Sequence, residues 1–484
     1  MPEKEPTHSV RSGLPKGLPM FTASDPQALI EENAKLAELQ SKGFLKRWRG
    51  YFLLTGPGWL QSALTLGGGS AMASLFAGAY LRYKLLWVQP LAMLIGIVML
   101  AAVSQQTLST GQRPFPMMKR ILSPAVAWAW AFGALAVTVI WHFAQYALAA
   151  GMTEDMIRAC TGWQPAPAAR TIVLVGIGVV FLVISTAVTW SYGRGHKGVK
   201  LYERTLKVFV LLIMIAFALV VARQAFAGHI RWGEVLRGFV PHELAIKDPR
   251  TVALVMGAFG AAVGINSTFL ISYSLLARGW GKQHRGLSWF DLITGTFLPF
   301  SIVTSLVIIA AGATIYNPQI FALGATALSP VKAASMFESA GLNVFLARIV
   351  FGLGILGMTL STITVHMLMS GFAVCEMFGI EPGGWRYRLA CLLPAPAATG
   401  VIFWKYMGSW LAVPASAICG LFLPFAYIIF FILNNSRRYL GPDKPTGAKA
   451  FLWNIAMLIA IVVSTVSACY YIYSQVLSNW KDLW

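Results

Sequence analysis

Residues 55–80 read TGPGWLQSALTLGGGSAMASLFAGAY, and this stretch decides the fold. It is long and apolar enough to cross a bilayer core, which takes about 20 residues of helix. The run Gly67-Gly68-Gly69-Ser70 is unsuited to an uninterrupted helix, because each glycine costs about 1 kcal/mol relative to alanine. The stretch therefore predicts a membrane-spanning helix that is broken near its middle.

A second stretch repeats this pattern. Residues 255–279 read VMGAFGAAVGINSTFLISYSLLARG, again apolar, with small and polar residues from Gly264 to Thr268. The two stretches lie five predicted spans apart, and broken helices at matching positions are typical of an inverted repeat of five plus five helices. Taken singly, each set of small residues is also explained by close helix packing. The matched positions favour a pair of breaks.

The rest of the chain fits a polytopic, all-α membrane protein. Of the 484 residues, 57% are hydrophobic and only 12% are charged, against about 25% charged in a soluble protein. We predict about eleven spanning helices, at residues 54–79, 84–104, 123–150, 169–189, 203–223, 251–277, 291–315, 342–374, 387–404, 411–434 and 449–476. Residues 1–50 then form a cytoplasmic tail with a short amphipathic helix, residues 51–223 the first repeat, residues 251–434 the second repeat and residues 449–476 an extra helix.

The basic residues predict the orientation. Lys and Arg are about twice as frequent in the segments on the N-terminal side of the predicted spans as in those on the other side. Membrane proteins keep such basic segments in the cytoplasm, so we predict a cytoplasmic N-terminus and an extracytoplasmic C-terminus. Orientation in the cell membrane and contact with anionic lipid explain the net charge of +20 without a nucleic-acid partner.

The two breaks indicate a transport site. A break frees backbone N–H and C=O groups that lipid cannot satisfy, so these groups must face protein or a water-filled cavity. The half-helix ends carry partial charges that bind ions or polar solutes. The sequence has no nucleophile–base pair, metal-ligand cluster or phosphate loop, and its five cysteines are dispersed. We therefore expect neither an enzyme nor a cofactor.

Polar side chains at the breaks have two interpretations. Asn266, Ser267 and Thr268 either contact the substrate or cap the freed backbone groups, as short polar side chains do. Ser70 has the same two alternatives. The sequence leaves both open.

Two histidines lie inside predicted spans. His142 belongs to the third span and His366 to the eighth. A titratable group inside a membrane is a functional candidate by default, which makes both histidines candidates for a proton pathway. The alternative is a neutral, hydrogen-bonded histidine with a structural role.

Several blocks of sequence resemble one known family. These are GPGWLQSA (56–63), AGAYLRYKLLWV (77–88), WFDLITG (289–295), STIT (361–364), LPFA (423–426) and RRYLG (437–441). They resemble the natural resistance-associated macrophage protein (Nramp) family, whose members are proton-coupled transporters of divalent metals. The resemblance implies the broken-helix, inverted-repeat fold of amino-acid and sodium symporters.

The resemblance also shows departures at the expected metal site. Gly67 takes the place of the family's metal-binding aspartate, and Ser70 that of its asparagine. At the second break Gly264 replaces the family's methionine ligand and Asn266 its histidine. The acidic pair of the family's proton route falls near Tyr146 and Ala149, neither of which is acidic.

Backbone ligands remain possible despite these losses. The resemblance implies that the carbonyls of Leu64 and Ala261 bind the ion. The candidate substrate-binding residues are therefore Leu64, Gly67, Gly68, Gly69, Ser70, Ala261, Gly264, Asn266, Ser267 and Thr268. No side chain among them is singled out as a metal ligand.

These observations predict an alternating-access transporter. The expected substrate is a divalent metal ion held by neutral oxygen ligands and water, magnesium-like rather than manganese- or iron-like, because the soft methionine ligand is missing. A proton is a candidate co-substrate. One alternative is a small organic solute, such as an amino acid or carboxylate, held on backbone N–H groups of the glycine-rich break. A second alternative is a transport-inactive sensor.

Overall fold

The computed structural model describes residues 26–192, 195–241, 248–320, 328–380, 384–402 and 412–474. These residues form one helical bundle, and the described part contains no β-strand. The outer parts of the predicted N-terminal tail and of the C-terminus, residues 1–25 and 475–484, lie outside it.

The first half of the chain covers the predicted N-terminal tail, the predicted first repeat and the connection that follows it. Its helices are α1 (Pro26–Gln40), α2 (Phe44–Leu54), α3 (Pro57–Thr65), α4 (Gly68–Leu81), α5 (Val88–Thr110), α6 (Pro114–Ile121), α7 (Pro124–Thr161), α8 (Pro167–Ser191), α9 (Gly195–Phe226) and α10 (Trp232–Gly238). The predicted first span is α3 plus α4, and the segment before it is two helices, α1 and α2.

The second half has the same helical character. Its elements are α11 (Pro249–Ala262), α12 (Ile265–Ala277), η2 (Lys282–His284), α13 (Arg285–Leu292), η3 (Ile293–Phe297), α14 (Leu298–Thr314), α15 (Pro330–Ser339), η5 (Phe345–Val350), α16 (Phe351–Phe378), α17 (Trp385–Cys391), η6 (Ala395–Thr399), α19 (Ala412–Gly420), α20 (Leu423–Asn434), α21 (Arg437–Leu440), η8 (Gly441–Asp443) and α22 (Gly447–Ile472). The predicted sixth span is α11 plus α12.

The described residues hold nine helices long and apolar enough to cross a membrane. The bent pair α3 and α4 adds a tenth span. The predicted span at 387–404 is the exception, because α17 ends at Cys391 and a 3₁₀ turn follows from Ala395 to Thr399. Pro394 and Pro396 cause this difference, since each lacks the N–H that a continuous helix needs.

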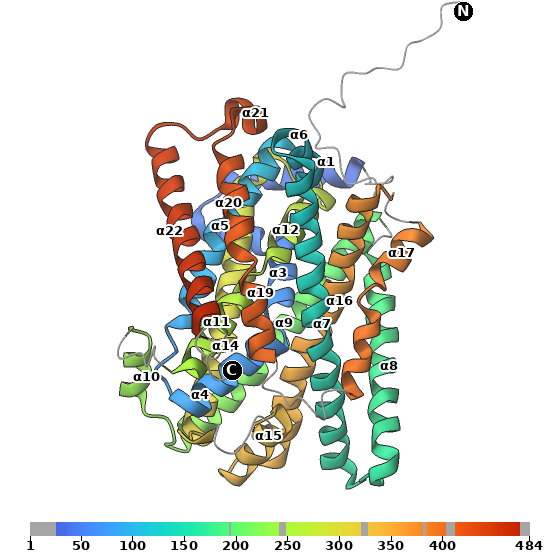
Figure 1. Cartoon of the computed structure of the whole chain (residues 1–484), viewed down its shortest axis with the longest axis vertical. Helices are drawn as coiled ribbons and strands as arrows, with labels where there is room; N and C mark the ends of the chain where they lie inside the picture. The colour runs from blue at the N-terminus through green and yellow to red at the C-terminus, as the bar shows by residue number, and fades with distance from the viewer. Residues whose placement is uncertain are drawn as a thin grey trace, which may run out of the picture.

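The short helices between the spans gather at two opposite ends of the bundle. Helices α1, α6 and α21 lie at the upper end in Figure 1, and α10 and α15 lie at the lower end. The upper end thus collects segments that the charge count predicts to be cytoplasmic.

Burial separates central helices from peripheral ones. The most apolar part of Pro249–Ala277, the α11–α12 span, is 94% buried, whereas that of α22 is 28% buried. Helix α7 packs against α16, α4 against α14, and α11 against α19. The two broken spans therefore run through the interior, where their freed backbone groups are shielded from lipid.

Candidate functional site

The first break is closed by a serine three residues along. Helix α3 ends at Thr65, helix α4 begins at Gly68, and the two are bent by 54°. The Ser70 hydroxyl accepts the Gly67 N–H at 3.1 Å and donates to the Thr65 carbonyl at 2.6 Å. Ser70 thus satisfies backbone groups that the break frees, which is the capping interpretation of this residue.

The second break is closed in the same way. Val263 and Gly264 are extended between α11 and α12. The Ser267 hydroxyl accepts the Gly264 N–H at 3.3 Å. Both breaks therefore have the pattern Gly-x-x-Ser, with an extended glycine before the half-helix and a serine that caps it.

The three glycines of the first break allow neighbouring helices to approach. A Cβ at Gly69 would lie 2.2 Å from the Ser416 hydroxyl oxygen, and a Cβ at Gly67 would lie 2.7 Å from that of Thr362. The Gly68 N–H donates to Gln145 Oε1 at 2.8 Å. Helices α19, α16 and α7 thus contact the break directly.

A small cavity lies between the two breaks. Its volume is about 10 Å³, the space of one water-sized sphere. Its lining includes five of the predicted substrate-binding residues: Leu64, Gly67, Gly69, Ser70 and Ala261. The lining also includes Thr65, Trp141, Gln145, Thr362 and Ser416, and no acidic, histidine, cysteine or methionine side chain is among these ten residues.

The other predicted residues do not line this cavity. Thr268 accepts the indole N–H of Trp130 at 3.1 Å, and the Asn266 amide donates to the Thr138 hydroxyl at 3.2 Å. Both contacts tie α12 to α7. Gly68, Gly264 and Ser267 shape the breaks without reaching the lining.

The two predicted histidines meet. Nδ1 of His142 on α7 lies 3.3 Å from Nδ1 of His366 on α16, and both side chains are fully buried. One Nδ1 must therefore carry a proton and the other accept it. Trp141, which lines the cavity, stacks on His366 with ring centroids 6.1 Å apart. Within the described chain neither Nε2 atom has a hydrogen-bond partner.

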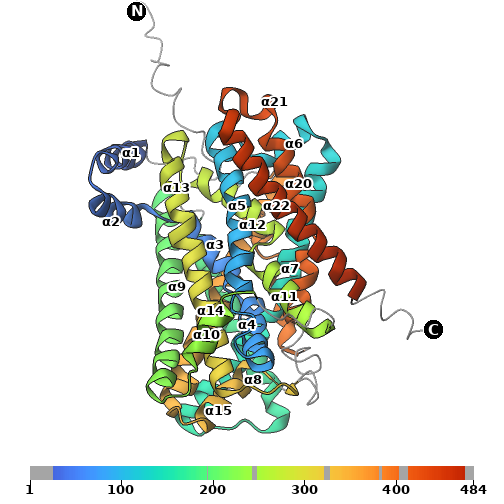
Figure 2. The same cartoon turned by 90° about the vertical axis from the view of Figure 1, so that its left-hand side faces the viewer.

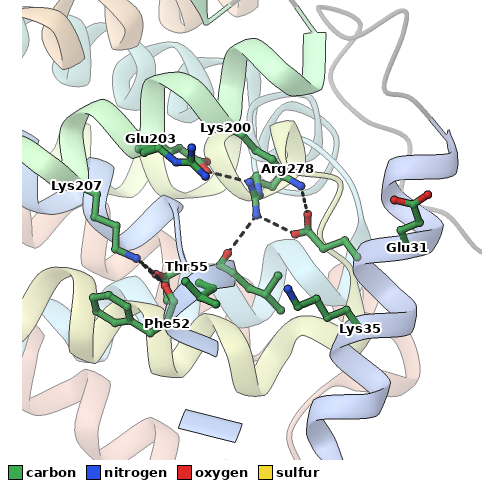
Figure 3. Close-up of a pocket in the computed structure, with 12 residues that line it drawn as sticks. Glu31, Lys35, Phe52, Thr55, Lys200, Glu203, Lys207 and Arg278 are labelled. Atoms are coloured by element: carbon green, nitrogen blue, oxygen red, sulfur yellow. Dashed lines mark hydrogen bonds and ion pairs between the residues drawn. The ribbon is translucent and has the colours of Figure 1, made fainter. Parts of the chain in front are cut away.

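A charged network closes the end of the bundle nearest α1 (Figure 3). Arg278 donates to Glu32 of α1 at 2.8 Å, to Glu203 of α9 at 3.1 Å and to the Leu54 carbonyl at 3.1 Å. Asp291 accepts the Gly58 N–H at 2.7 Å, at the start of α3. This network holds the first half of the broken span in place.

Sequence reasoning missed several of these residues. Thr362 belongs to the STIT block, which was noted only as a resemblance, and Ser416 carries no signal in a lone sequence. The partners of Arg278, Glu32 and Glu203, lie on helices far apart in the chain, so local spacing in the sequence does not predict these ion pairs. Across the described residues, no group of three or more His, Cys, Asp or Glu side chains could hold a metal ion.

The geometry first defines a class of protein. Two broken spans meet at a shared cavity inside a helical bundle, which is the arrangement of broken-helix transporters. Solved structures agree on the fold. A mutant of the Eremococcus coleocola manganese transporter matches with a TM-score of 0.65 at 16% identity, covering 90% of this chain and 89% of that one. MhsT in complex with L-phenylalanine matches with a TM-score of 0.55 at 15% identity, covering 85% and 98%.

The sequence comparisons then give the family. The model described as natural resistance-associated macrophage protein-like matches residues 58–474. A divalent metal cation transporter, MntH of Brucella suis, is 23% identical over 422 residues, which are 84% of this chain and 86% of the relative. The chain belongs to the Nramp family, as the resemblance in the sequence predicts.

Proposed function

We propose that the protein is an alternating-access transporter for a divalent metal ion, bound between the two helix breaks through neutral oxygen atoms and water. The observation that carries this proposal is the cavity of about 10 Å³ that is lined by the first break and by Ala261 of α11, near the second break. Its size fits a single ion, and its lining supplies hydroxyls and backbone carbonyls. The names of the relatives, which are divalent metal cation transporters, support the same substrate class.

The chemistry of the lining favours a hard, magnesium-like ion over manganese or iron. Soft sulfur and imidazole ligands select transition metals, whereas oxygen ligands suit magnesium, and the ten lining residues offer no such soft side chain. Without a carboxylate to balance its charge, the ion should bind weakly. Magnesium keeps several waters, so the cavity must widen in another state of the transport cycle to admit it.

The organic-solute alternative finds less support. Pockets for small organic ligands are typically about 300–1,000 Å³, and the cavity between the breaks is far smaller. Uptake of an organic solute in a transport assay would favour this alternative, and a folded protein that transports nothing would favour the transport-inactive sensor.

A proton is the proposed co-substrate, carried by His142 and His366. The facing Nδ1 atoms lie 3.3 Å apart, within hydrogen-bond distance of each other. Trp141 lies between this pair and the cavity, stacking on His366 and lining the cavity. If the pair, with both imidazoles neutral, took up one further proton, it would gain a positive charge next to Trp141, and so close to the bound ion.

Calorimetry on a matched pair of variants tests the binding site. Thr362→Val removes a hydroxyl that lines the cavity, and we expect Mg²⁺ affinity to fall about tenfold, the value of one hydrogen bond to a charged group. Thr359→Val is the control, since its hydroxyl is buried on the same helix and bonds the Ile355 carbonyl at 3.1 Å, away from the cavity. Equal affinities in both variants, or binding of alanine in place of any divalent ion, would contradict the proposal.

A further inference from the structure

A second cavity lies at the end of the bundle that holds α1. Its volume is about 470 Å³, and residues of α1, α2 and α9 line it, together with Thr55 and Arg278, which directly follow α2 and α12. Figure 3 shows its charged side chains, which come mainly from α1 and α9. This cavity is separate from the one between the helix breaks, with which it shares no lining residue.

Cations outnumber acids in this cavity. The basic lining residues are Lys35, Lys200, Arg204, Lys207 and Arg278, and the acidic ones are Glu31, Glu32 and Glu203. Arg278 binds both Glu32 and Glu203, and Lys200 also binds Glu32, at 2.8 Å, so two cations compensate these two acids. Glu31 lies at the edge of the group in Figure 3, on the opposite side from Lys207.

Several of the cations are available to a ligand. The ammonium of Lys207 has only neutral partners: the Phe52 carbonyl at 2.6 Å, the Thr55 hydroxyl at 2.9 Å and the face of the Phe52 ring, whose centroid is 3.7 Å away, so no carboxylate balances its charge directly. Lys35 and Arg204 are exposed, and neither forms an ion pair with another described residue. Arg278 is 3% exposed, and its Nε has no hydrogen-bond partner in the described part of the chain.

The neighbouring helix α2 places this cavity at a membrane surface. Phe44, Leu45 and Trp48 are 70%, 77% and 45% exposed, with basic residues between and beside them. Leu53, which lines the cavity, is 74% exposed. Helices α1 and α2 project sideways from the bundle end in Figure 2. An exposed apolar face with basic neighbours is typical of a helix lying in the interface.

We propose that this cavity binds the phosphate headgroup of an anionic phospholipid, held between Lys35 of α1 and Arg204 and Lys207 of α9. Basic pockets on the cytoplasmic side of membrane proteins bind such headgroups. The lipid origin follows from α2 and Leu53, whose apolar side chains would lie against the acyl chains. The bound phosphate would bridge α1 to α9, at the place where Arg278 already joins them.

Thermal-shift titration of the purified full-length protein in detergent tests this site. The probes are dioctanoyl phosphatidylglycerol, dioctanoyl phosphatidylcholine and inorganic phosphate. We expect phosphatidylglycerol to bind, and phosphatidylcholine and phosphate to bind far more weakly. The double variant Lys35→Gln/Arg204→Gln should weaken phosphatidylglycerol binding by about tenfold or more, since each basic residue near an anionic surface adds to binding.

The matched control removes two charges elsewhere at the same end. Arg437 and Arg438 of α21 are exposed and do not line the cavity, so Arg437→Gln/Arg438→Gln should leave phosphatidylglycerol binding unchanged. All substituted residues are exposed, and unfolding midpoints without lipid should match the parent protein. Equal weakening in both double variants, or tight binding of phosphatidylcholine, would overturn the proposal. Phosphate binding as tightly as phosphatidylglycerol would overturn the lipid origin and assign the cavity to a soluble phosphate.

Discussion

At the scale of single residues, the two breaks use one capping device. Ser70 and Ser267 each bond the N–H of the glycine three residues before them. A serine in this place satisfies a backbone donor that would otherwise be buried without a partner. Their equivalent positions in the two halves explain why both breaks remain stable inside the bundle.

The packing of Gly69 gives a first prediction. A Cβ there would lie 2.2 Å from the Ser416 hydroxyl oxygen, so Gly69→Ala should lower the free energy of unfolding by about 1–3 kcal/mol, as overpacking does, and reduce transport. Gly69→Ala/Ser416→Ala removes the clashing oxygen and should recover most of the lost stability, but not transport, because the Ser416 hydroxyl lines the cavity. Unfolding curves and flux assays measure the two effects.

Gly151 supplies the control for this prediction. It lies within α7, and a Cβ there would meet only Val331, at 4.0 Å. Gly151→Ala should leave transport unchanged. A double variant that is as unstable as Gly69→Ala alone would show that the hydroxyl of Ser416 is not the obstacle.

The histidine pair gives a second prediction. His142→Gln and His366→Gln each remove one half of the Nδ1 contact, so ion flux into liposomes should lose its response to an imposed pH gradient. Flux without a gradient should remain, since neither histidine lines the cavity. A response to the gradient that persists in both variants would remove the pair from the proton route.

The positions of the two helix breaks could be predicted from the sequence, whereas the residues of other helices that line the cavity could not. The glycine runs and their serines are local patterns, so the break positions could be predicted from spacing alone. Thr362 and Ser416 approach the first break from helices about 300 residues away. Only tertiary packing brings them there, and no single-sequence periodicity encodes it.

At the scale of elements, α1 is anchored by its one buried acid. Glu32 is 5% exposed and binds Arg278 and Lys200, both at 2.8 Å. Arg278 in turn bonds Glu203 of α9 and the end of α2. Through Glu32 and Arg278, helix α1 is thus tied to α9 and to the end of α2.

This anchoring gives a third prediction. Glu32→Ala leaves Arg278 with one carboxylate in a buried position, and breaking a buried pair in this way costs about 3–5 kcal/mol. We expect faster hydrogen exchange throughout α1 and a lower unfolding midpoint. Glu38→Ala, on the same helix, breaks an exposed pair with Lys42 and should leave the unfolding midpoint close to that of the parent protein. Similar exchange rates in the two variants would show that Glu32 does not hold α1.

Most elements were predictable from hydropathy, and the exceptions have physical causes. In the ninth predicted span the helix is interrupted at Pro394 and Pro396, within an otherwise apolar run. The predicted third span stops at residue 150, whereas α7 continues to Thr161. Its last turns leave the apolar region, where hydropathy no longer marks a helix.

At the scale of the whole molecule, contacts between distant segments tie helices together at both ends of the bundle. At the end near α1, Arg278 pairs with Glu32 and Glu203. At the opposite end the Asn317 N–H donates to the Ala79 carbonyl at 2.7 Å, and Arg82 pairs with Glu234 of α10 at 3.0 Å. In this arrangement the cavity at the first break has a volume of about 10 Å³.

The small number of acidic residues is a property of the whole chain that bears on the proposed ion site. The chain has 18 Asp and Glu against 38 Lys and Arg, and the acids of the Arg278 network serve as partners of basic residues. None of the residues that line the cavity between the breaks is acidic. A site without a carboxylate is the feature that separates this chain from the ligand pattern its family resemblance implies.

Ion uptake by proteoliposomes tests the central claim most directly. Purified protein is reconstituted with ion-sensitive dyes inside, and Mg²⁺, Mn²⁺, Ca²⁺ and labelled alanine are added outside in turn. The account predicts Mg²⁺ uptake that Mn²⁺ does not outcompete at equal concentration, no alanine uptake, and reduced flux in Thr362→Val. A folded protein that carries no divalent ion, or one that strongly prefers Mn²⁺, would contradict it.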